Sequence, residues 1–179
     1  MKIPIPDPSL KDDTIALRPW SMEDVPAITA ICQDAEIPRW TTVPTPYTED
    51  NAREFVSEMT APDLEKTLGL AIISQADEVA GSLSMWIVMR GVVEFGYWVS
   101  PEARGRGYAP RALLLLAGWA VNTMEIRRLQ LGTIPGNSAS ERVAEKTGFS
   151  RDGILRSYAD QRGDARDVTM WSLLPSELG

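Results

Sequence analysis

The sequence predicts a single mixed α+β domain. Its 179 residues are 44% hydrophobic and 24% charged, the ordinary composition of one globular unit that buries its own core. The apolar patterns predict the order strand, helix, helix, three strands, helix, strand, helix and two strands. Because three strands follow one another closely and helices separate the next ones, we expect a mixed, mostly antiparallel sheet of about seven strands flanked by about four helices.

The N-terminal part of the chain begins with a segment that lacks a clear pattern. Residues 1–13 contain three prolines and little apolar periodicity, so we expect an N-terminal arm and then one domain over residues 14–175. Residues 14–17 are apolar enough for a first strand. A Ser-x-x-Asp capping pattern over residues 21–24 precedes apolar residues at helical spacing, which predict a helix over residues 25–32.

The middle of the chain combines a proline-rich segment with a run of strands. Residues 37–47 carry three prolines and are predicted to form a loop, and a second helix is predicted to begin near Thr48. Short turns separate three apolar, β-rich runs, which therefore predict an antiparallel meander. These runs cover residues 68–74, 79–88 and 92–99.

The C-terminal half changes from a meander to alternating helices and strands. A loop rich in glycine and arginine leads into a leucine-rich helix, and a strand, a shorter helix and a closing hairpin follow. The loop covers residues 101–107, the helices 109–124 and 138–147, the strand 129–134, and the hairpin strands 154–158 and 168–174.

The chain contains no histidine and one cysteine, Cys32. The absence of histidine excludes a Ser-His-Asp triad, a Cys-His pair and any histidine-bearing zinc or iron site. A single cysteine excludes an intrachain disulfide and a thiolate metal cluster, and we expect Cys32 to be a buried small hydrophobe. No metal site is predicted, and proton transfer in an enzyme of this composition relies on carboxylates, Tyr, Ser, Lys or water.

The charge balance is acidic, with a net charge of −7 and a pI of about 4.7. This argues against general binding to nucleic acid or to an anionic membrane, although a local basic patch can still hold a phosphate. The longest apolar stretch, residues 112–121, is too short to span a bilayer. No basic stretch precedes an apolar run at the N-terminus, so we expect no signal peptide and a cytoplasmic location.

Residues 98–111 form the most informative segment, because a strand runs into a two-glycine loop and then directly into a helix. Gly105 and Gly107 let the backbone turn sharply, so that loop N–H groups and the helix N-terminus converge on an anion. Arg104, Arg106 and Arg111 add positive charge in an acidic protein. The segment predicts a phosphate or pyrophosphate site; the alternative is a plain turn with solvated arginines.

Several motifs together resemble the GNAT acetyltransferases. Residues 104–109 (RGRGYA) fit the Arg/Gln-x-x-Gly-x-Gly/Ala signature of that superfamily, and residues 94–99 resemble its fourth strand. Residues 137–149 resemble the segment that follows its fifth strand. Asp152-Gly153 and residues 167–169 match the end of the RimJ/RimL-type subgroup, which acetylates the N-termini of ribosomal proteins.

The resemblance implies a sheet whose fourth and fifth strands splay apart, with acetyl-CoA in the gap as co-substrate. The pantetheine would lie beside Trp98 and Val99, and a backbone N–H of Val99 or a neighbour would stabilise the oxyanion. The pyrophosphate would lie on the loop, and Asn137 would contact the pantetheine or thiol end. The implied cofactor-binding residues are Trp98, Val99, Arg104, Gly105, Arg106, Gly107, Tyr108, Ala109 and Asn137.

Ser140 is the first catalytic candidate that the resemblance implies. It occupies the position where the RimJ/RimL type places a serine near the leaving sulfur, so its role would be a hydrogen bond to the departing thiolate. The alternative is a local role in the first turn of a helix capped by a box from Ser138 to Glu141. Many GNAT members place a tyrosine later in this helix, where this chain has Ala144.

Two carboxylates are candidates for the base that deprotonates the amine. Glu94 lies on the predicted fourth strand, where several GNAT enzymes keep a base, but strand alternation does not settle which face it occupies. The subgroup can carry a glutamate at the position of Ala159, and Asp160 would point to the opposite face of a regular strand. Four nearby aromatic residues are expected to form core or cleft wall. They are Trp40, Trp86, Tyr97 and Trp98.

The resemblance therefore implies an acetyl-CoA-dependent N-acetyltransferase that acts directly on a primary amine, without a covalent enzyme intermediate. A protein or peptide α-amine and a small-molecule amine both remain open as acceptors, and the chain is a monomer or a homodimer. One alternative is a catalytically weak acetyl-CoA-binding or regulatory module. The other, which rests only on the glycine and arginine loop, is a phosphoprotein binder or nucleotide binder that does not use CoA.

Overall fold

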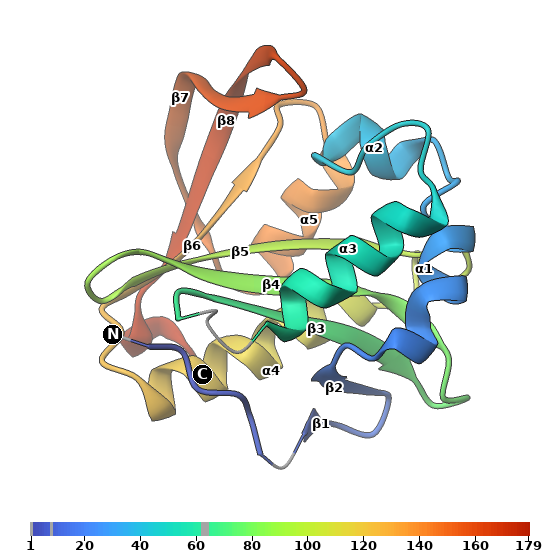
Figure 1. Cartoon of the computed structure of the whole chain (residues 1–179). Helices are drawn as coiled ribbons and strands as arrows, with labels where there is room; N and C mark the ends of the chain where they lie inside the picture. Colours follow the sequence, from blue (N-terminus) through green and yellow to red (C-terminus); the bar gives the residue numbers. More distant parts are fainter. Residues whose placement is uncertain (1, 8, 62–64) are drawn as a thin grey trace.

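The computed structural model describes residues 2–7, 9–61 and 65–179. Within this part of the chain, one eight-stranded sheet has the order β1-β2-β3-β4-β5-β6-β8-β7, with helices on both of its faces (Figure 1). The strands are β1 Leu10–Lys11, β2 Ile15–Pro19, β3 Thr67–Ser74, β4 Val79–Met89, β5 Val92–Val99, β6 Arg128–Thr133, β7 Ser150–Gln161 and β8 Asp164–Leu173. The helices are α1 Val25–Ile31, α2 Glu36–Trp40, α3 Glu49–Thr60, α4 Tyr108–Thr123 and α5 Ser138–Lys146.

The sequence-based prediction of a mixed, mostly antiparallel α+β fold is confirmed, with one strand and one helix more than expected. The added strand is β1, which pairs antiparallel with β2 inside the segment predicted to be an arm. The prediction of a loop over residues 37–47 was wrong for its first part, because α2 covers Glu36–Trp40. Pro38 is the third residue of this helix, where its missing N–H breaks no intrahelical hydrogen bond.

Two apolar cores lie on opposite faces of the sheet. On one face, the buried residues Leu113 and Leu116 of α4 pack with Leu83 and Phe95 of the central strands. On the other face, α1 and α3 pack against β3 in a second cluster that includes the fully buried Val56. The central strands of the meander are therefore packed on both faces, and this packing holds them in place at the base of the site.

The N-terminal segment is attached to this domain at several points. Ile3 is buried, and its N–H donates a 2.9 Å hydrogen bond to the carbonyl of Glu65. Asp12 and Asp13 both form ion pairs with Arg111 on α4. Because Arg111 is held by these carboxylates, it is less free to bind a phosphate than its place after the glycine loop suggested.

The sheet opens between β5 and β6. These two strands pair in parallel only from Val92 opposite Arg128 to Phe95 opposite Leu131. Beyond this point they diverge, so the β6-facing edge of residues 96–99 has no strand partner among the described residues. The sequence-based prediction of two splayed strands is thereby confirmed.

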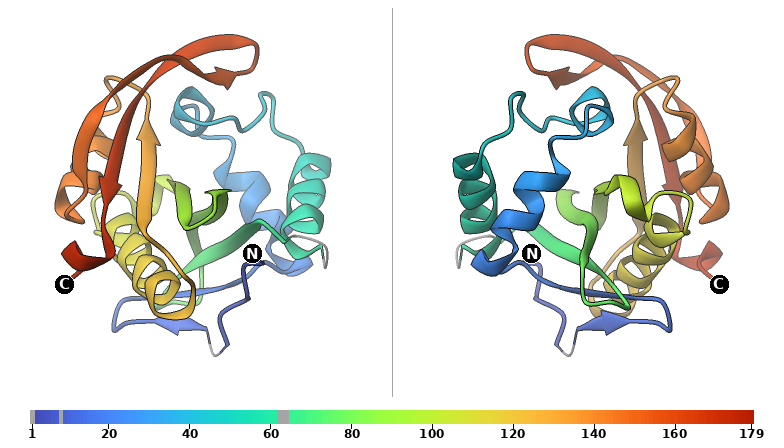
Figure 2. Two further views of the ribbon diagram at one scale, coloured as in Figure 1. Left: turned by 90° about the vertical axis from the view of Figure 1, so that its left-hand side faces the viewer. Right: turned by 90° about the vertical axis from the view of Figure 1, so that its right-hand side faces the viewer.

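The long hairpin of β7 and β8 extends beyond the sheet and arches over this opening toward α2 (Figure 2). Its tip contacts the α2–α3 segment through hydrogen bonds from Gln161 and Arg162. None of the helices in the described ranges has the length and apolarity needed to cross a membrane.

Candidate functional site

The opening between β5 and β6 contains two adjoining cavities. The larger, of about 720 Å³, lies between β4–β5, α3 and the arched hairpin. The smaller, of about 470 Å³, lies between the end of β5, the start of α4 and α5. A set of six residues lines both cavities and forms a shared wall. These residues are Trp40, Thr41, Tyr97, Trp98, Asn137 and Ser140.

The smaller cavity is built on the loop that the sequence analysis singled out. Gly105 and Gly107 adopt left-handed conformations, with φ of 75° and 77°, and Gly107 is the residue immediately before α4. No heavy atom lies within 4 Å of where a Cβ would stand on either glycine, so the backbone there is open to a ligand. Exposed loop N–H groups and a helix N-terminus provide what a pyrophosphate needs.

The predicted cofactor-binding residues do not all face this cavity. Arg104, Gly105, Gly107, Tyr108 and Ala109 line it. Arg106 is exposed and does not belong to the lining of either cavity. The guanidinium of Arg104 forms an ion pair with Asp34, so part of its charge is already compensated.

Two further cations line the smaller cavity and were missed from the sequence. Arg142 and Lys146 lie four residues apart on α5, and this spacing places both on the same side of the helix. The spacing was visible in the sequence, but nothing there showed that this side of α5 faces the glycine loop. Together with Arg104 they outnumber the one carboxylate of the lining, Glu36, so the cavity has a net positive lining.

Residues at the end of β5 line the cavities with their backbone as well as their side chains. Trp98 lines both cavities and Val99 lines the smaller one. The N–H of Ser100 donates to the carbonyl of Ala80 on the β4 side. Because successive N–H groups of a strand point in opposite directions, the N–H of Val99 points toward the opening. The N–H of Val99 is therefore free to act as a donor, and its role as the oxyanion donor stays a prediction.

Asn137 and Ser140 lie together at the start of α5. Asn137, and not Ser138 as the spacing suggested, is the residue that caps this helix, because its side-chain Oδ1 accepts a 3.2 Å hydrogen bond from the N–H of Ser140. This hydrogen bond fixes the Asn137 side chain at the N-terminus of α5, where the residue lines both cavities. Ser140, in the first turn, is half-buried and its hydroxyl is not used in capping.

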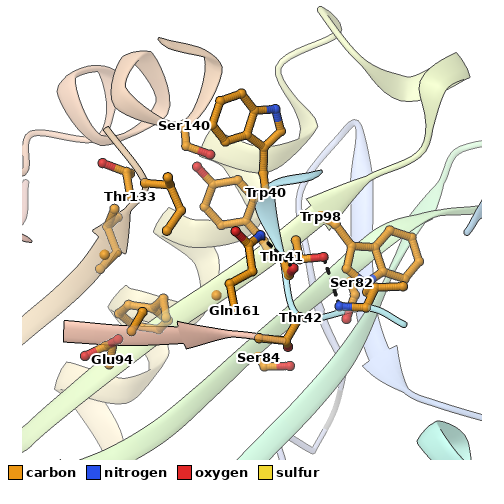
Figure 3. A pocket seen from close by; sticks show the side chains of 18 of the residues that line it. Trp40, Thr41, Thr42, Ser82, Ser84, Glu94, Trp98, Thr133, Ser140 and Gln161 are labelled. Atoms are coloured by element: carbon orange, nitrogen blue, oxygen red, sulfur yellow. Dashed lines mark hydrogen bonds between the residues drawn. The ribbon is translucent and has the colours of Figure 1, made fainter. Parts of the chain in front are cut away.

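Glu94 faces the larger cavity, which answers the question that strand alternation left open. Its Oε2 accepts a 2.6 Å hydrogen bond from Nε2 of Gln130, the residue opposite it on β6. Burial raises the pKa of the Glu94 carboxyl above its ordinary value, and the hydrogen bond from Gln130 offsets part of that rise. Figure 3 shows Glu94 and Ser140 projecting into the same pocket from β5 and α5.

Asp160 also lines the larger cavity, but its surroundings differ from those of Glu94. It is exposed, and its Oδ1 accepts a 2.8 Å hydrogen bond from the N–H of Gly163 in the turn of the hairpin. Asp160 therefore stabilises the β7–β8 turn, whereas Glu94 is a partly desolvated carboxylate near the shared wall.

Gln161 is a site residue that sequence reasoning missed. It is buried, and its Nε2 donates to the carbonyls of Arg39 at 2.9 Å and Thr41 at 3.0 Å, with a longer contact to that of Pro38. Figure 3 shows it reaching Thr41 across the pocket. We call this set of hydrogen bonds the Gln161 clasp. It joins the hairpin to the end of α2 and covers the larger cavity.

The larger cavity has an acidic and aromatic lining. No lysine or arginine is among the described residues that line it, although the chain has 18 of them. Its carboxylates come from α3, β5 and β7, and its aromatic side chains come from the same elements, from β4 and from the α2–α3 segment. The carboxylates are Glu54, Glu58, Glu94 and Asp160, and the aromatic residues include Trp40, Tyr47, Phe55, Trp86, Trp98 and Tyr158.

Comparisons with known proteins agree with this geometry. A family model described as "Acetyltransferase (GNAT) domain" matches residues 14–150. The uncharacterized N-acetyltransferase p20 of Bacillus licheniformis is 26% identical over 174 residues, which cover 94% of this chain and 97% of that protein. The ribosomal-protein-serine acetyltransferase of Escherichia coli strain K12 is 30% identical over 98 residues, or 54% of each chain.

Solved structures share the fold as well. The structure of Mycobacterium smegmatis RimJ in complex with CoA-disulfide superposes with a TM-score of 0.83 at 22% identity, covering 95% of this chain and 87% of that one. This likeness supports the same chain path over nearly the whole domain, including the opening between β5 and β6.

Proposed function

Because this chain belongs to the GNAT family of N-acetyltransferases, we propose that it transfers the acetyl group of acetyl-CoA directly to a primary amine that enters the larger cavity. The observation that supports this most strongly is the shared wall between two cavities of opposite charge. An anionic acyl donor fits the positive smaller cavity, and a cationic amine fits the acidic larger one.

Acetyl-CoA is the donor that the smaller cavity fits best. Its pyrophosphate matches the loop over residues 104–109 and the N-terminus of α4, and Arg142 and Lys146 add charge for its phosphates. The unpaired edge of residues 96–99 provides backbone groups for the amides of the pantetheine chain, which then leads toward the shared wall.

Three groups, one from each cavity and one from the shared wall, can divide the chemistry between them: Glu94 in the larger cavity, Val99 in the smaller and Ser140 in the wall. Glu94, directly or through water, removes a proton from the incoming ammonium, since burial favours a carboxylate that holds a proton more tightly than usual. The N–H of Val99 stabilises the oxyanion that forms as nitrogen attacks the thioester carbon. Ser140 donates a hydrogen bond to sulfur as the carbon–sulfur bond breaks and its electron pair moves to sulfur.

The acceptor that suits the larger cavity is a cationic amine without a carboxylate or phosphate near its nitrogen. Any anionic group would face Glu54, Glu58, Glu94 or Asp160 with no lysine or arginine in the described lining to compensate it. Aromatic walls favour an apolar or aromatic body on that amine. One relative acts on ribosomal-protein serine, so peptides with an N-terminal serine belong among the test acceptors.

The experiment is to follow thiol release from acetyl-CoA in the presence of matched acceptors, with mass spectrometry of the products. An arylalkylamine is compared with the α-amino acid that carries the same side chain, and with a peptide that begins with serine. Turnover of the amine at a rate at least about tenfold above that of its amino acid is expected. Binding of acetyl-CoA without turnover of any acceptor at any pH would instead identify a binding or regulatory module.

A further inference from the structure

The hydroxyl of Tyr97 is a buried polar group for which the structure provides no hydrogen-bond partner. Among the described side chains, only this oxygen and Nε1 of Trp20 are both fully covered and unpartnered. A buried hydroxyl without a partner is unfavourable for the folded protein, and such groups are few in native structures. Tyr97 also lines both cavities, so this uncompensated donor lies at the shared wall.

Several other polar groups of the shared wall already form hydrogen bonds. Nε1 of Trp40 donates to Oε2 of Glu36 at 3.1 Å. The hydroxyl of Thr41 donates to the carbonyl of Ile37 at 2.7 Å, and Oδ1 of Asn137 accepts from the N–H of Ser140. Of the three hydroxyls in this wall, those of Thr41, Tyr97 and Ser140, only the last two have no hydrogen-bond acceptor among the described residues.

These two hydroxyls are neighbours. Tyr97 and Ser140 both line the two cavities, so their side chains meet at the shared wall. Burial raises the pKa of the Tyr97 phenol to about 12, and the side chain of Ser140 offsets part of that rise. The two groups nevertheless form no hydrogen bond of good geometry in the structure. The oxygen of Ser140 is placed by a single side-chain torsion and its O–H turns freely about one further bond, so this group can adjust to a partner.

We propose that Tyr97 is a positioning residue, whose hydroxyl donates to Oγ of Ser140 and so directs the O–H of Ser140 toward the thioester sulfur. A serine oxygen that accepts one hydrogen bond has its own O–H free to donate to another group. The hydroxyl of Tyr97 is itself fully covered, so it acts through Ser140 and not on the substrate. This inference rests on the proposed function, because it assumes that Ser140 faces the leaving sulfur.

The chemistry of the step requires a hydrogen bond and not a proton from Tyr97. When the amine nitrogen bonds to the acetyl carbon, the carbon–sulfur bond breaks and the electron pair stays on sulfur, while Glu94 or water takes the ammonium proton. A thiol has a pKa of about 8.5, well below that of a phenol at about 12. The proton therefore stays on Tyr97, and the two hydroxyls stabilise the thiolate until solvent protonates it.

The test is the pKa of the CoA thiol in its complex with the protein, measured from thiolate absorbance as pH is raised. The same titration with CoA that lacks its sulfur provides the baseline for tyrosine ionisation. In the unchanged protein the bound thiol should titrate below its free value. Ser140→Ala should raise this pKa by about one unit, a tenfold change in the ionisation constant, and Tyr97→Phe should raise it by about half a unit.

The double variant that combines Ser140→Ala with Tyr97→Phe distinguishes a Tyr97 that positions Ser140 from a Tyr97 that acts on the thiol independently. If Tyr97 acts through Ser140, adding Tyr97→Phe to Ser140→Ala changes the thiol pKa no further, whereas independent contributions would add. Because the phenol has no partner to lose, Tyr97→Phe should unfold at the same temperature as the unchanged protein or higher. Ser138→Ala, in the same turn of α5 but outside the lining of both cavities, is the matched control and should leave the thiol pKa unchanged.

The outcomes separate this inference from the proposed function. If the pKa of the bound thiol shifts in Ser140→Ala but not in Tyr97→Phe, the role of Tyr97 is overturned and the proposed function is not. The role of Tyr97 is also overturned if Tyr97→Phe shifts the thiol pKa equally in the unchanged protein and in Ser140→Ala. It is likewise overturned if Tyr97→Phe lowers the unfolding temperature and weakens the binding of CoA and of its sulfur-free analogue equally. Failure of the unchanged protein to bind CoA overturns the proposed function together with this inference.

Discussion

The two cavities of the site are adjacent, yet they are built in different ways. Half of the residues that line the smaller cavity come from one continuous stretch, the end of β5, the glycine loop and the start of α4, and the cavity presents backbone N–H groups together with cations from the loop and from α5. The larger is formed by side chains from α3, β5 and the β7–β8 hairpin, and it presents carboxylates and aromatic rings. One chain of net charge −7 thus holds an anion-binding and a cation-binding compartment against a single wall.

This difference indicates where specificity resides. A donor held by backbone groups depends on the conformation of a short segment, which tolerates many side chains but few changes of glycine. An acceptor held by side chains depends on residues far apart in sequence, and on the Gln161 clasp that keeps the hairpin over them. Substitutions in the smaller cavity should change the KM for acetyl-CoA, and substitutions in the larger cavity should change the KM for the amine.

Glu94→Gln should produce the largest loss. Removing the base should lower kcat by about 100-fold or more, because general-base catalysis contributes on that order. The unchanged enzyme should lose activity as pH falls through the raised pKa of Glu94, and this acid limb should vanish in the variant. Steady-state kinetics across pH, with Glu102→Gln as the exposed control, measure both effects.

The same substitution should stabilise the fold near neutral pH. Burial raises the pKa of Glu94 in the folded state, so the native protein binds this proton more tightly than the unfolded chain does. Stability therefore falls as pH rises from the unfolded pKa, about 4.3, through the folded one. Glu94→Gln should remove that loss, and its advantage in thermal unfolding should disappear below about pH 4. A lower stability at pH 7 would contradict the assignment of Glu94 as a carboxylate that burial destabilises in its charged form.

Gly107→Val tests the smaller cavity. An L-residue at a φ of 77° is strained by about 1–2 kcal/mol, and a β-branched side chain would also cover the N–H groups that face the ligand. The KM for acetyl-CoA should rise by about 30-fold, while the KM for the amine changes little. Gly118→Ala lies within α4 with open space around it, and this control should keep both KM values and gain up to about 1 kcal/mol of stability.

The contrast between the cavities also explains what the sequence could predict. The loop from Arg104 to Ala109 and the unpaired end of β5 are contiguous, so the motif and the strand–loop–helix order were enough to indicate them. The side chain of Glu94 was named, but its direction depends on the pairing of β5 with β6, which one-dimensional alternation does not contain.

The Gln161 clasp over the larger cavity could not be predicted from the sequence. Gln161 contacts backbone carbonyls more than 100 residues earlier in the chain, and a glutamine near a turn carries no signal for such a partner. Similarly, the three prolines of residues 37–47 favoured a loop, whereas Pro38 lies in the first turn of α2, where proline is tolerated.

Gln161→Ala should remove the Gln161 clasp and so weaken the contact between the β7–β8 hairpin and α2. The buried carbonyls of Arg39 and Thr41 would lose their donor, and each such loss costs about 1–3 kcal/mol when water does not replace it. The KM for the amine should rise by about tenfold with an unchanged KM for acetyl-CoA, and the unfolding temperature should fall. Gln161→Glu keeps the size but turns the donor into an acceptor, so it should be at least as damaging. An equal rise in both KM values would show that the clasp does not belong to the acceptor compartment alone.

Asp160→Asn should have the smallest effect, and it decides between the two candidate bases. The asparagine oxygen can still accept the hydrogen bond from the N–H of Gly163, so the turn should stay intact while the charge is removed. Because Asp160 is exposed and its charge is screened by solvent, kcat should change by about threefold or less, and the acid limb of the pH profile should remain. A loss of kcat as large as that of Glu94→Gln, together with loss of the acid limb, would instead make Asp160 the base and Glu94 a wall of the cavity.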